Sequence, residues 1–271
     1  MSAPSGSVPL GGLAGVTLEE LTARAGLQTR VDRKYVVPVA VAEALVAALH
    51  DRLDDGLRVL RVDGRERFDY ASVYLDTPDL TCFRGAAQRR RRRFKVRTRT
   101  YLDSAACFVE VKTRGPRGTT VKTRVPYDAD PSAPLTGAAT AFVAGVLDAA
   151  TVPAPAGPLT PALVTRYARR TFLLTGPAPS RVTVDTGLTW AGTGTVAPSH
   201  AALRLDGLAV VETKTGSTPS AADRLLWRHG HRPVRLSKYG TGMAVLDPRL
   251  PCTPWRPVLD RHVAPALVPA G

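Results

Sequence analysis

Acidic side chains and aromatic side chains are both scarce in this sequence. Only 23 Asp and Glu residues stand against 37 Lys and Arg, which gives a formal net charge of +14. Such an imbalance favours a polyanionic partner, which is nucleic acid, an anionic membrane, or a phosphate-rich molecule or polymer. Aromatic residues make up only 6% of the chain. Because base-stacking surfaces need aromatic side chains, we expect the partner to be something other than nucleic acid.

Long apolar runs are also missing, as is any cysteine pattern. No run reaches the roughly 18 apolar residues that cross a bilayer, and the first segment lacks the basic and apolar regions of a signal peptide. We therefore expect a cytoplasmic protein with no integral membrane segment. The three cysteines, Cys82, Cys107 and Cys252, are odd in number and widely spaced. They are expected to be free thiols.

Lysine is rare among the basic residues, since 31 of the 37 are arginines. A lysine ammonium binds phosphate as a compact point charge, unlike the planar guanidinium of arginine. Lysines kept in such an arginine-rich composition are therefore expected to be needed as lysines, although a chance remainder is the alternative. All six fall in strand-like segments or short motifs: Lys34, Lys95, Lys112, Lys122, Lys214 and Lys238.

Alternating polar and apolar residues predict about eight strands with helices inserted between them. The predicted strands are 29–37, 68–76, 94–102, 107–113, 120–127, 163–174, 181–190 and 203–215. The predicted helices are 18–26, 38–53, 136–149 and 219–230. The strands follow one another too closely for a doubly wound parallel sheet. We expect an α+β fold in which an antiparallel sheet of about eight strands closes into a barrel with peripheral helices.

Charged residues recur at alternate positions of these strands, and side chains two residues apart share one face. One face would carry Lys95, Arg97 and Arg99, and others would carry Glu110 with Lys112, Lys122 with Arg124, and Glu212 with Lys214. Any single strand of this kind could simply face water. In a closed barrel, however, the faces would meet in one basic lumen, which is costly unless a polyphosphate fills it. A carboxylate inside would then suit Mg²⁺ or Mn²⁺.

A run of five arginines, Arg89–Arg93, precedes the predicted strand 94–102, and eight of the eleven residues from 89 to 99 are basic. The run is interpreted as an electrostatic funnel that gathers a polyanion. A plain solvated turn and a nucleic-acid surface are the alternatives.

The ordered set of strand motifs resembles the VTC-type polyphosphate polymerase domain of the triphosphate tunnel metalloenzyme (CYTH-like) superfamily. The motifs are DRKYVV (32–37), SVYLDT (72–77), KVRTRTY (95–101), FVEVKTR (108–114), VKTRVPY (121–127), RYARRTF (166–172), RVTVDTGLTW (181–190), VVETKTG (210–216) and SKYGTGM (237–243). The resemblance implies an antiparallel tunnel barrel that binds triphosphate or polyphosphate with a divalent metal.

The resemblance also implies roles for individual residues. The implied catalytic residues are Arg97, Arg99, Lys112, Lys122, Arg169 and Lys238. The implied phosphate-binding residues are Lys34, Arg84, Lys95, Arg124, Arg181 and Lys214. The implied ligands of Mn²⁺ or Mg²⁺ are Glu212 and Glu110, with Asp185 as a further candidate.

The resemblance favours an enzyme that transfers the γ-phosphate of ATP to a growing polyphosphate chain. A metal-dependent triphosphatase and a non-catalytic polyphosphate-binding module are the alternatives. Relatives that hydrolyse triphosphates carry Glu-x-Glu-x-Lys on the first strand, whereas this chain has Arg30-Val31-Asp32-Arg33-Lys34. Fewer carboxylates there weaken the triphosphatase interpretation. The expected partners are ATP and inorganic polyphosphate or triphosphate, and the oligomeric state is left open.

The expected organisation has three parts. Residues 1–17 are rich in Gly, Pro and Ser and are expected to be a flexible N-terminal segment. Residues 18–247 would form the VTC-type tunnel domain. Residues 248–271 would be a Pro-rich C-terminal tail that packs irregularly.

Overall fold

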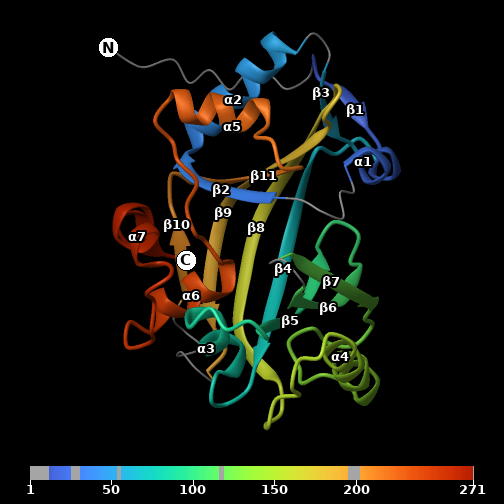
Figure 1. Ribbon diagram of the computed structural model, residues 1–271, viewed down its shortest axis with the longest axis vertical. Helices are drawn as coiled ribbons and strands as arrows, with labels where there is room; N and C mark the ends of the chain where they lie inside the picture. The colour runs from blue at the N-terminus through green and yellow to red at the C-terminus, as the bar shows by residue number, and fades with distance from the viewer. Residues whose placement is uncertain (1–11, 26–30, 54–55, 116–118, 195–201, 271) are drawn as a thin grey trace. The chain divides into compact units, whose positions relative to one another are not determined.

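The computed structural model describes residues 12–25, 31–53, 56–115, 119–194 and 202–270 (Figure 1). These residues divide into two compact units, each assembled from separate stretches of the chain. Unit 1 takes its described residues from 12–67, 169–186 and 207–234. Unit 2 takes them from 68–168, 187–206 and 235–270.

The fold combines short helices with a large, mainly antiparallel sheet, so the predicted α+β class is confirmed. The strands are β1 (Ala14–Val16), β2 (Val31–Pro38), β3 (Leu57–Leu60), β4 (Arg67–Asp76), β5 (Phe94–Tyr101), β6 (Cys107–Arg114), β7 (Thr120–Pro126), β8 (Thr160–Leu174), β9 (Ser180–Gly192), β10 (Ala202–Leu205), β11 (Leu208–Thr215) and β12 (Leu267–Pro269). The helices are α1 (Leu18–Ala25), α2 (Val39–Arg52), α3 (Thr81–Ala87), α4 (Gly137–Ala149), α5 (Ala221–Arg228), α6 (Lys238–Leu246) and α7 (Arg256–Val258).

The sheet has twelve strands where about eight were predicted, and every predicted strand is present. The hydrogen-bonded order is β12-β10-β9-β8-β4-β5-β6-β7, while β11 pairs with β2 and β9, and β3 pairs with β1 and β8. Among the described residues β12 and β7 do not pair with each other, so hydrogen bonds do not close the sheet. The predicted strand 203–215 divides into β10 and β11 because Gly207 turns the chain with a φ of 64°.

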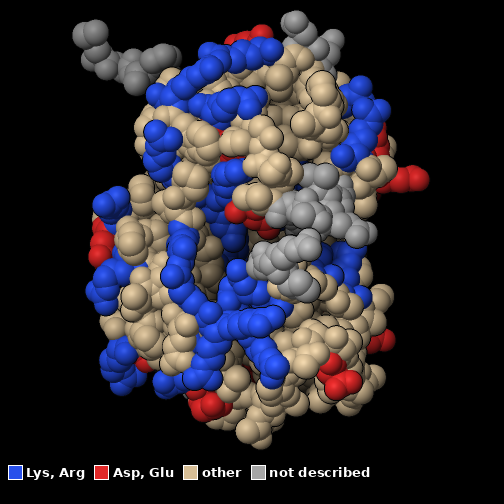
Figure 2. Space-filling model, in the orientation of Figure 1, with Lys and Arg blue, Asp and Glu red and all other residues tan. Residues whose placement is uncertain are grey.

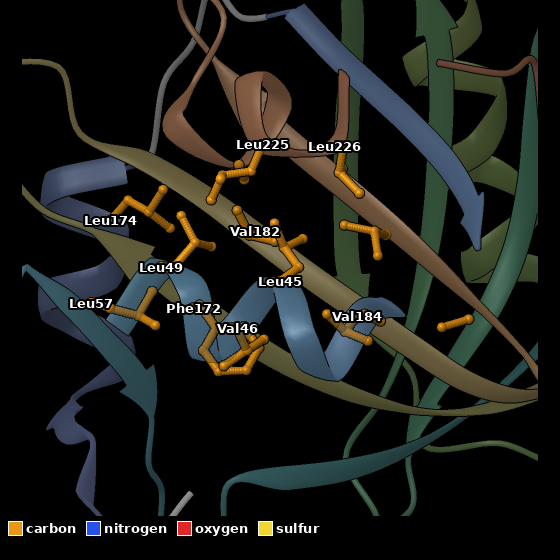
Figure 3. Packing of buried hydrophobic residues seen from close by; sticks show 14 of the residues in the cluster. Leu45, Val46, Leu49, Leu57, Phe172, Leu174, Val182, Val184, Leu225 and Leu226 are labelled. Carbon is orange, nitrogen blue, oxygen red and sulfur yellow. The ribbon is translucent and has the colours of Figure 1, made fainter. Parts of the chain in front are cut away.

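Unit 1 has its hydrophobic core on one face of β2, β9 and β11, and α2 and α5 pack against that face (Figure 3). The alternate residues Val182, Val184 and Val211 point into this core. Leu45 and Leu49 come from α2, four residues apart, which places them on the same side of that helix. Figure 1 shows α2 and α5 lying together. Because one face of each strand is committed to the core, the intervening residues must lie on the opposite face.

Unit 2 contains the antiparallel strands β4, β5, β6 and β7. The alternate residues Val96, Val109 and Val111 are buried on one face, and α4 packs against β6 with Val143 and Leu147 buried. The strands β6 and β7 pair antiparallel along their length and form a hairpin. Its tip, residues 116–118, lies outside the described residues.

The motif SKYGTGM forms the start of α6, where its two glycines allow close packing of indole rings. A Cβ on Gly240 would collide with the ring of Trp255, and a Cβ on Gly242 would collide with Trp190. Trp190 Nε1 also donates a hydrogen bond to the carbonyl of Lys238, at 2.7 Å. These contacts fix where α6 begins and hold the backbone of Lys238 in place at its start.

Short strands and turns lie in both terminal segments, as far as the structure describes them. Of the predicted flexible segment 1–17, residues 1–11 lie outside the described residues, but β1 pairs in parallel with β3. The C-terminal segment, predicted to pack irregularly, contains α7, a π-helical turn at Leu259–Val263, a 3-10 turn at Ala264–Ala266, and β12. Three-residue strands are too short to show an alternating pattern, so neither β1 nor β12 was visible in the sequence. No helix among the described residues is long and apolar enough to cross a membrane.

Candidate functional site

Unit 1 presents a charged face on the side of β2, β9 and β11 opposite its core. In the register of these strands Lys34 lies directly across from Glu212, and Asp32 lies directly across from Lys214. Arg181 lies across from Lys214 on the other side. Directly opposed residues share a face in an antiparallel pair, so acids and bases lie together on this face, with Lys214 between Asp32 of β2 and Arg181 of β9. The unit 1 face is defined by Asp32, Lys34, Arg169, Arg181, Asp185, Glu212 and Lys214.

Arginines of the unit 1 face are already engaged with protein groups. Arg169 donates from Nε and Nη2 to the two carboxylate oxygens of Asp185, at 2.6 and 2.8 Å. Arg181 donates to the carbonyls of Leu21 and Ala25 at the end of α1, at 3.3 and 3.2 Å. An arginine at that position satisfies the last carbonyls of a helix and favours its dipole. Two basic residues predicted for phosphate chemistry thus also hold the fold together.

Glu212 and Lys214 form the central pair of the unit 1 face, with 2.8 Å between Oε1 and Nζ. Burial opposes ionisation of Glu212, but the positive charges of Lys214, Lys34 and Arg169 outweigh it and hold the pKa of this carboxyl well below its ordinary value. Burial lowers the pKa of Lys214, although Glu212 beside it favours the ammonium. Glu212 is therefore a carboxylate at neutral pH, and its side chain is 14% exposed.

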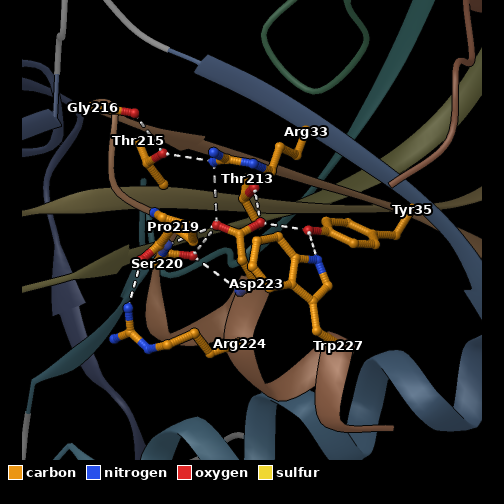
Figure 4. Close-up of polar contacts among 10 residues, drawn as sticks. All are labelled: Arg33, Tyr35, Thr213, Thr215, Gly216, Pro219, Ser220, Asp223, Arg224 and Trp227. Atoms are coloured by element: carbon orange, nitrogen blue, oxygen red, sulfur yellow. Dashed lines mark hydrogen bonds and ion pairs between the residues drawn. The ribbon is translucent and has the colours of Figure 1, made fainter. Parts of the chain in front are cut away.

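A buried carboxylate holds β2 and β11 together from behind this face (Figure 4). Asp223, on α5, accepts hydrogen bonds from Tyr35 Oη of β2 at 2.6 Å and from Thr213 Oγ1 of β11 at 2.7 Å. It also accepts from the backbone and the hydroxyl of Ser220, which completes a capping box for α5. Burial and the neighbouring Asp223 raise the pKa of Tyr35, so its hydroxyl stays protonated as a donor. Asp223 thereby helps to fix the register that sets Lys34 against Glu212.

Unit 2 presents a second charged face, on the side of β4, β5, β6 and β7 opposite the buried valines. Three lysines lie in one row directly across three strands: Lys95 on β5, Lys112 on β6 and Lys122 on β7. Like charges placed directly opposite one another destabilise a sheet. The unit 2 face is defined by Tyr74, Lys95, Arg97, Arg99, Glu110, Lys112, Lys122 and Arg124, and the three lysines are its lysine row.

Glu110 is the carboxylate in the middle of the unit 2 face and is completely buried. Arg97 donates to its Oε2 from Nε at 2.9 Å and also from Nη2. The ammonium of Lys122 lies 3.4 Å from Oε1. Burial opposes ionisation of Glu110, but the charges of Arg97, Arg99 and Lys122 outweigh it and hold its pKa well below the ordinary range. Arg97 gives its remaining amino group to Tyr74 Oη at 3.0 Å, so it acts mainly as a buried support.

Two further basic side chains of unit 2, Arg99 and Lys238, lie against tyrosine rings. Arg99 lies over the ring of Tyr70, and its Nη2 donates to Tyr167 Oη at 2.9 Å. The rings of Tyr70 and Tyr167 stack, with their centroids 5.3 Å apart. Lys238 Nζ lies 4.4 Å from the centre of the Tyr167 ring. The aromatic faces attract these cations and set their direction.

The outer members of the predicted set differ in their placement. Arg124 lies on β7, over the ring of Phe108, and donates to Tyr101 Oη at 3.2 Å. Lys95 Nζ donates to Ser237 Oγ at 2.8 Å. Arg84 lies elsewhere, on α3, where it is exposed and donates to the carbonyl of Asp79. The strand faces therefore gather every predicted basic residue except Arg84 and the α6 residue Lys238.

All six lysines of the chain are accounted for by these two faces and the start of α6. Two belong to the unit 1 face and three form the lysine row, while the sixth begins α6. Figure 2 shows Lys and Arg side chains widely distributed over one side of the molecule, with fewer Asp and Glu among them. Apart from Lys238, the basic residues that the structure describes away from the two faces are arginines, as expected if lysine is retained where its ammonium is required.

The carboxylates differ in their fitness to bind a divalent cation. Glu212 is ionised and partly exposed, so it fits as one ligand for Mg²⁺ or Mn²⁺. Glu110 fits poorly, because both of its oxygens already face Arg97 or Lys122 and no surface of it is exposed. The described residues contain no group of three or more His, Cys, Asp or Glu side chains placed to hold a metal. A cation here would need water or phosphate oxygens to complete its coordination.

Sequence reasoning missed the polar residues that support the two faces. Besides Asp223, these include Asp76, which accepts hydrogen bonds from the backbone nitrogens of Cys82 and Phe83 at 2.8 and 2.9 Å, and from Tyr239 Oη. Asp76 thus holds the start of α3 and positions α6. The one signal in the sequence that could have revealed Asp76 is its place as a lone aspartate at the end of an apolar strand, since a buried carboxylate requires partners.

The comparisons with known proteins give one family and several distant structures. The model of the VTC domain matches residues 29–247, and no curated protein matches the chain. HpAC1 from Hippeastrum, a proposed adenylyl cyclase with a dominant triphosphatase activity, shares 14% identity with a TM-score of 0.46, over 80% of this chain and 96% of that chain. A proposed adenylate cyclase from Vibrio parahaemolyticus shares 14% identity with a TM-score of 0.38, over 75% and 84%.

A viral structure is similar at a lower score. The Mimivirus capping enzyme triphosphatase shares 10% identity with a TM-score of 0.28, over 78% of this chain and 91% of that chain. The family assignment rests on the domain match, which covers the strands that carry both charged faces. The chain belongs to the VTC domain family.

Proposed function

We propose that this chain binds triphosphate and polyphosphate and transfers the γ-phosphate of ATP to a growing inorganic polyphosphate chain. The observation that supports this most strongly is the lysine row, in which Lys95, Lys112 and Lys122 oppose one another across three strands. Such a row costs stability in the protein alone. A polyanion that bridges the three ammonium groups would turn this repulsion into binding energy.

The residues of unit 2 would bind and orient the phosphates. Arg99 and Lys122 would pair with phosphate oxygens, while Arg97 and Glu110 hold the neighbouring side chains in place. The side chain of Lys122 is 39% exposed, so its ammonium is available to an incoming anion. Fixed positive groups that need no rearrangement stabilise the charge that builds up during phosphoryl transfer.

In the proposed reaction a terminal oxygen of polyphosphate attacks the γ-phosphorus of ATP. A new P–O bond forms, the bond from that phosphorus to the bridging oxygen breaks, and ADP leaves with the electron pair. Phosphoryl transfer depends on alignment and charge stabilisation more than on a strong base. In unit 1, Glu212 would serve as one ligand for Mg²⁺ or Mn²⁺, and the metal would supply positive charge that neutralises phosphate.

The test is to incubate the purified protein with ATP and Mn²⁺ and to separate the products on a gel stained for polyphosphate. Chain growth with release of ADP is expected. Release of orthophosphate alone would instead establish a triphosphatase. Tight polyphosphate binding without any turnover would establish a binding module, and absence of binding would overturn the proposal altogether.

A further inference from the structure

The arginine turn, Arg89–Arg93, is the most basic segment that the proposed function does not use. It connects α3 to β5, within unit 2, and its first four side chains are exposed. Its backbone is anchored to α3, because the nitrogen of Arg90 donates to the carbonyl of Gly85 at 2.9 Å. Arg89 adopts a φ of 57°, which turns the chain sharply after the helix.

The last arginine braces this turn from inside. Arg93 is half-buried, and its Nη1 donates to the carbonyl of Arg90 at 2.7 Å and to that of Arg89 at 3.4 Å. Its Cβ lies where a side chain on Gly85 would have to pack. The guanidinium therefore holds the loop in one shape, and the four exposed arginines form a defined array.

Positive charge accumulates at this turn, and no carboxylate in the described part of the chain accepts a hydrogen bond from it. Arg90 donates to the Gln88 side chain, and Arg93 donates to backbone carbonyls. Burial, together with the positive charges of Arg114 and Arg89, lowers the pKa of Arg93. Repulsion among arginines is a cost in the free protein that a bound polyanion would relieve.

The arginine turn is continuous with the lysine row along β5. Lys95 follows Arg93 by two residues and begins that row. Phe94 pairs with Thr113, so Arg93 and Arg114 adjoin the same end of β5 and β6. We propose that the arginine turn binds the part of a long polyphosphate chain that extends beyond the lysine row. This rests on the proposed function and adds a second, chain-length-dependent binding surface to it.

The surroundings favour an inorganic polyanion over nucleic acid or a membrane. The aromatic residues that flank the turn, Phe83 and Phe94, are 0% and 4% exposed, so they offer no surface for stacking bases. Of the exposed large hydrophobic residues in the described chain, Leu18, Val31 and Val62 belong to unit 1 and Leu102 follows the other end of β5. Val121 pairs with Thr113 near the turn, but as one valine it is too small to insert into a membrane or to stack on bases. Guanidinium groups bind phosphate oxygens in pairs, and an array of four suits a repeating phosphate chain.

The experiment measures affinity for two phosphate probes of different length. The variant changes Arg89, Arg90, Arg91 and Arg92 to Gln and keeps Arg93 as the brace. The control changes four exposed arginines of unit 1 to Gln, which removes the same charge: Arg52, Arg65, Arg67 and Arg228. Each protein is titrated with tripolyphosphate and with long-chain polyphosphate. A double variant, R91Q/R92Q, replaces the first if thermal denaturation shows that the fourfold variant is unfolded.

The expected result is loss of long-chain affinity by about fivefold or more in the turn variant, because the variant removes four exposed charges that would each make a modest ion pair with phosphate. Its affinity for tripolyphosphate should stay within about twofold of the wild type, and the control should keep both affinities, because exposed charges outside the binding surface are largely screened by salt. Equal loss for both probes, or loss in neither, would overturn the inference while leaving the proposed function intact.

Two further probes separate the remaining sources of binding. Single-stranded DNA and anionic vesicles should bind the wild type more weakly than long polyphosphate at matched salt and phosphate concentration. Tighter binding of either one, lost in the turn variant, would assign the turn to that partner and overturn the inference. If wild-type protein binds neither phosphate probe, the proposed function fails, and the inference fails with it.

Discussion

The unit 1 face and the unit 2 face are both built from strands in which charged and apolar residues alternate, yet the two faces differ in their ratio of bases to acids. The unit 1 face sets four bases against three acids, and each carboxylate lies beside or across from a base. The unit 2 face sets six bases against Glu110 alone, and that carboxylate is buried beneath Arg97 and Lys122.

The two faces therefore show two ways in which a sheet can carry charged side chains. Ion pairs neutralise the unit 1 face within the protein, so it needs no ligand to be stable. The unit 2 face retains an excess of positive charge in the lysine row, which is costly unless an anion binds there. The acid-containing face therefore suits a cation, and the basic face suits the phosphates. Each of the following changes shifts one face toward the character of the other.

The largest expected effect is on turnover and comes from Glu212→Gln in unit 1. A carboxylate among phosphates would repel them unless a cation lies between, and the amide keeps the shape but not the charge. Metal-dependent turnover should be abolished, while polyphosphate affinity measured by calorimetry should change by less than about 1 kcal/mol. If the variant turns over ATP with unchanged Mn²⁺ dependence, Glu212 serves only to position Lys214.

The largest expected effect on stability comes from Glu110→Gln in unit 2. Removing this carboxylate leaves Arg97 buried without a countercharge, which should lower the free energy of unfolding by about 3–5 kcal/mol. Chemical denaturation at neutral pH measures it. As a control, Asp206→Asn breaks an exposed pair with Arg204 and should cost less than about 1 kcal/mol.

The pH dependence of this loss has a definite sign. The pKa of Glu110 is depressed in the folded protein, so its stabilising contribution is present above the ordinary glutamate pKa and is lost as pH falls toward the folded value. The difference between wild type and variant should therefore shrink only in strongly acidic solution. A difference that is small already at neutral pH would show that Arg97 is held by other groups.

The strands and their charged faces were predictable because alternation is local. Lys95, Arg97 and Arg99 share a face by their spacing alone, and the register confirms that Lys112 and Lys122 join them. Helix α5 was predictable because Ser220 and Asp223 form a capping box in sequence. That the two faces enclose one lumen, and the roles of the site residues in catalysis, stay predictions.

The parts of the fold and of the site that could not be predicted depend on contacts between residues far apart in the sequence. Helix α3 is short, begins after Leu80 in a left-handed conformation, and lacks a side-chain cap of its own. The carboxylate of Asp76 supplies the missing acceptor, which no helical periodicity reveals. Likewise, the sequence gives Glu110 and Glu212 the same Glu-x-Lys motif. Only the structure shows that Arg97 donates hydrogen bonds to Glu110 and that this carboxylate is buried. Glu212 is partly exposed and is therefore the better cation ligand.

A smaller effect is expected from removing one cation of the basic face. Lys122→Ala or Arg99→Ala should weaken tripolyphosphate binding by about 1–3 kcal/mol, which is the scale of a charge-assisted hydrogen bond. Calorimetry measures this, with Arg249→Ala as a control, since Arg249 is exposed and pairs with Asp247. Unchanged affinity in both variants would mean that phosphate does not bind at the unit 2 face.

The smallest effect is expected from Asp32→Asn, and it has the opposite sign. Asp32 is exposed, lies across from Lys214, and favours the charged form of that lysine. Removing its charge leaves four bases against two acids on the unit 1 face, which moves its balance toward that of unit 2. Tripolyphosphate should then bind more tightly by about 0.2–1 kcal/mol.

The control for this change is Asp51→Asn, which alters the net charge equally at an exposed position on α2. If the gain belongs to the face, Asp32→Asn should exceed the control at low salt, and the excess should shrink as added salt screens the charges. An equal gain in both variants would assign it to net charge alone. Weaker binding that appears only with Mn²⁺ present would instead make Asp32 a partner of Glu212 in holding the cation, so the acids of the unit 1 face would serve the metal rather than balance its lysines.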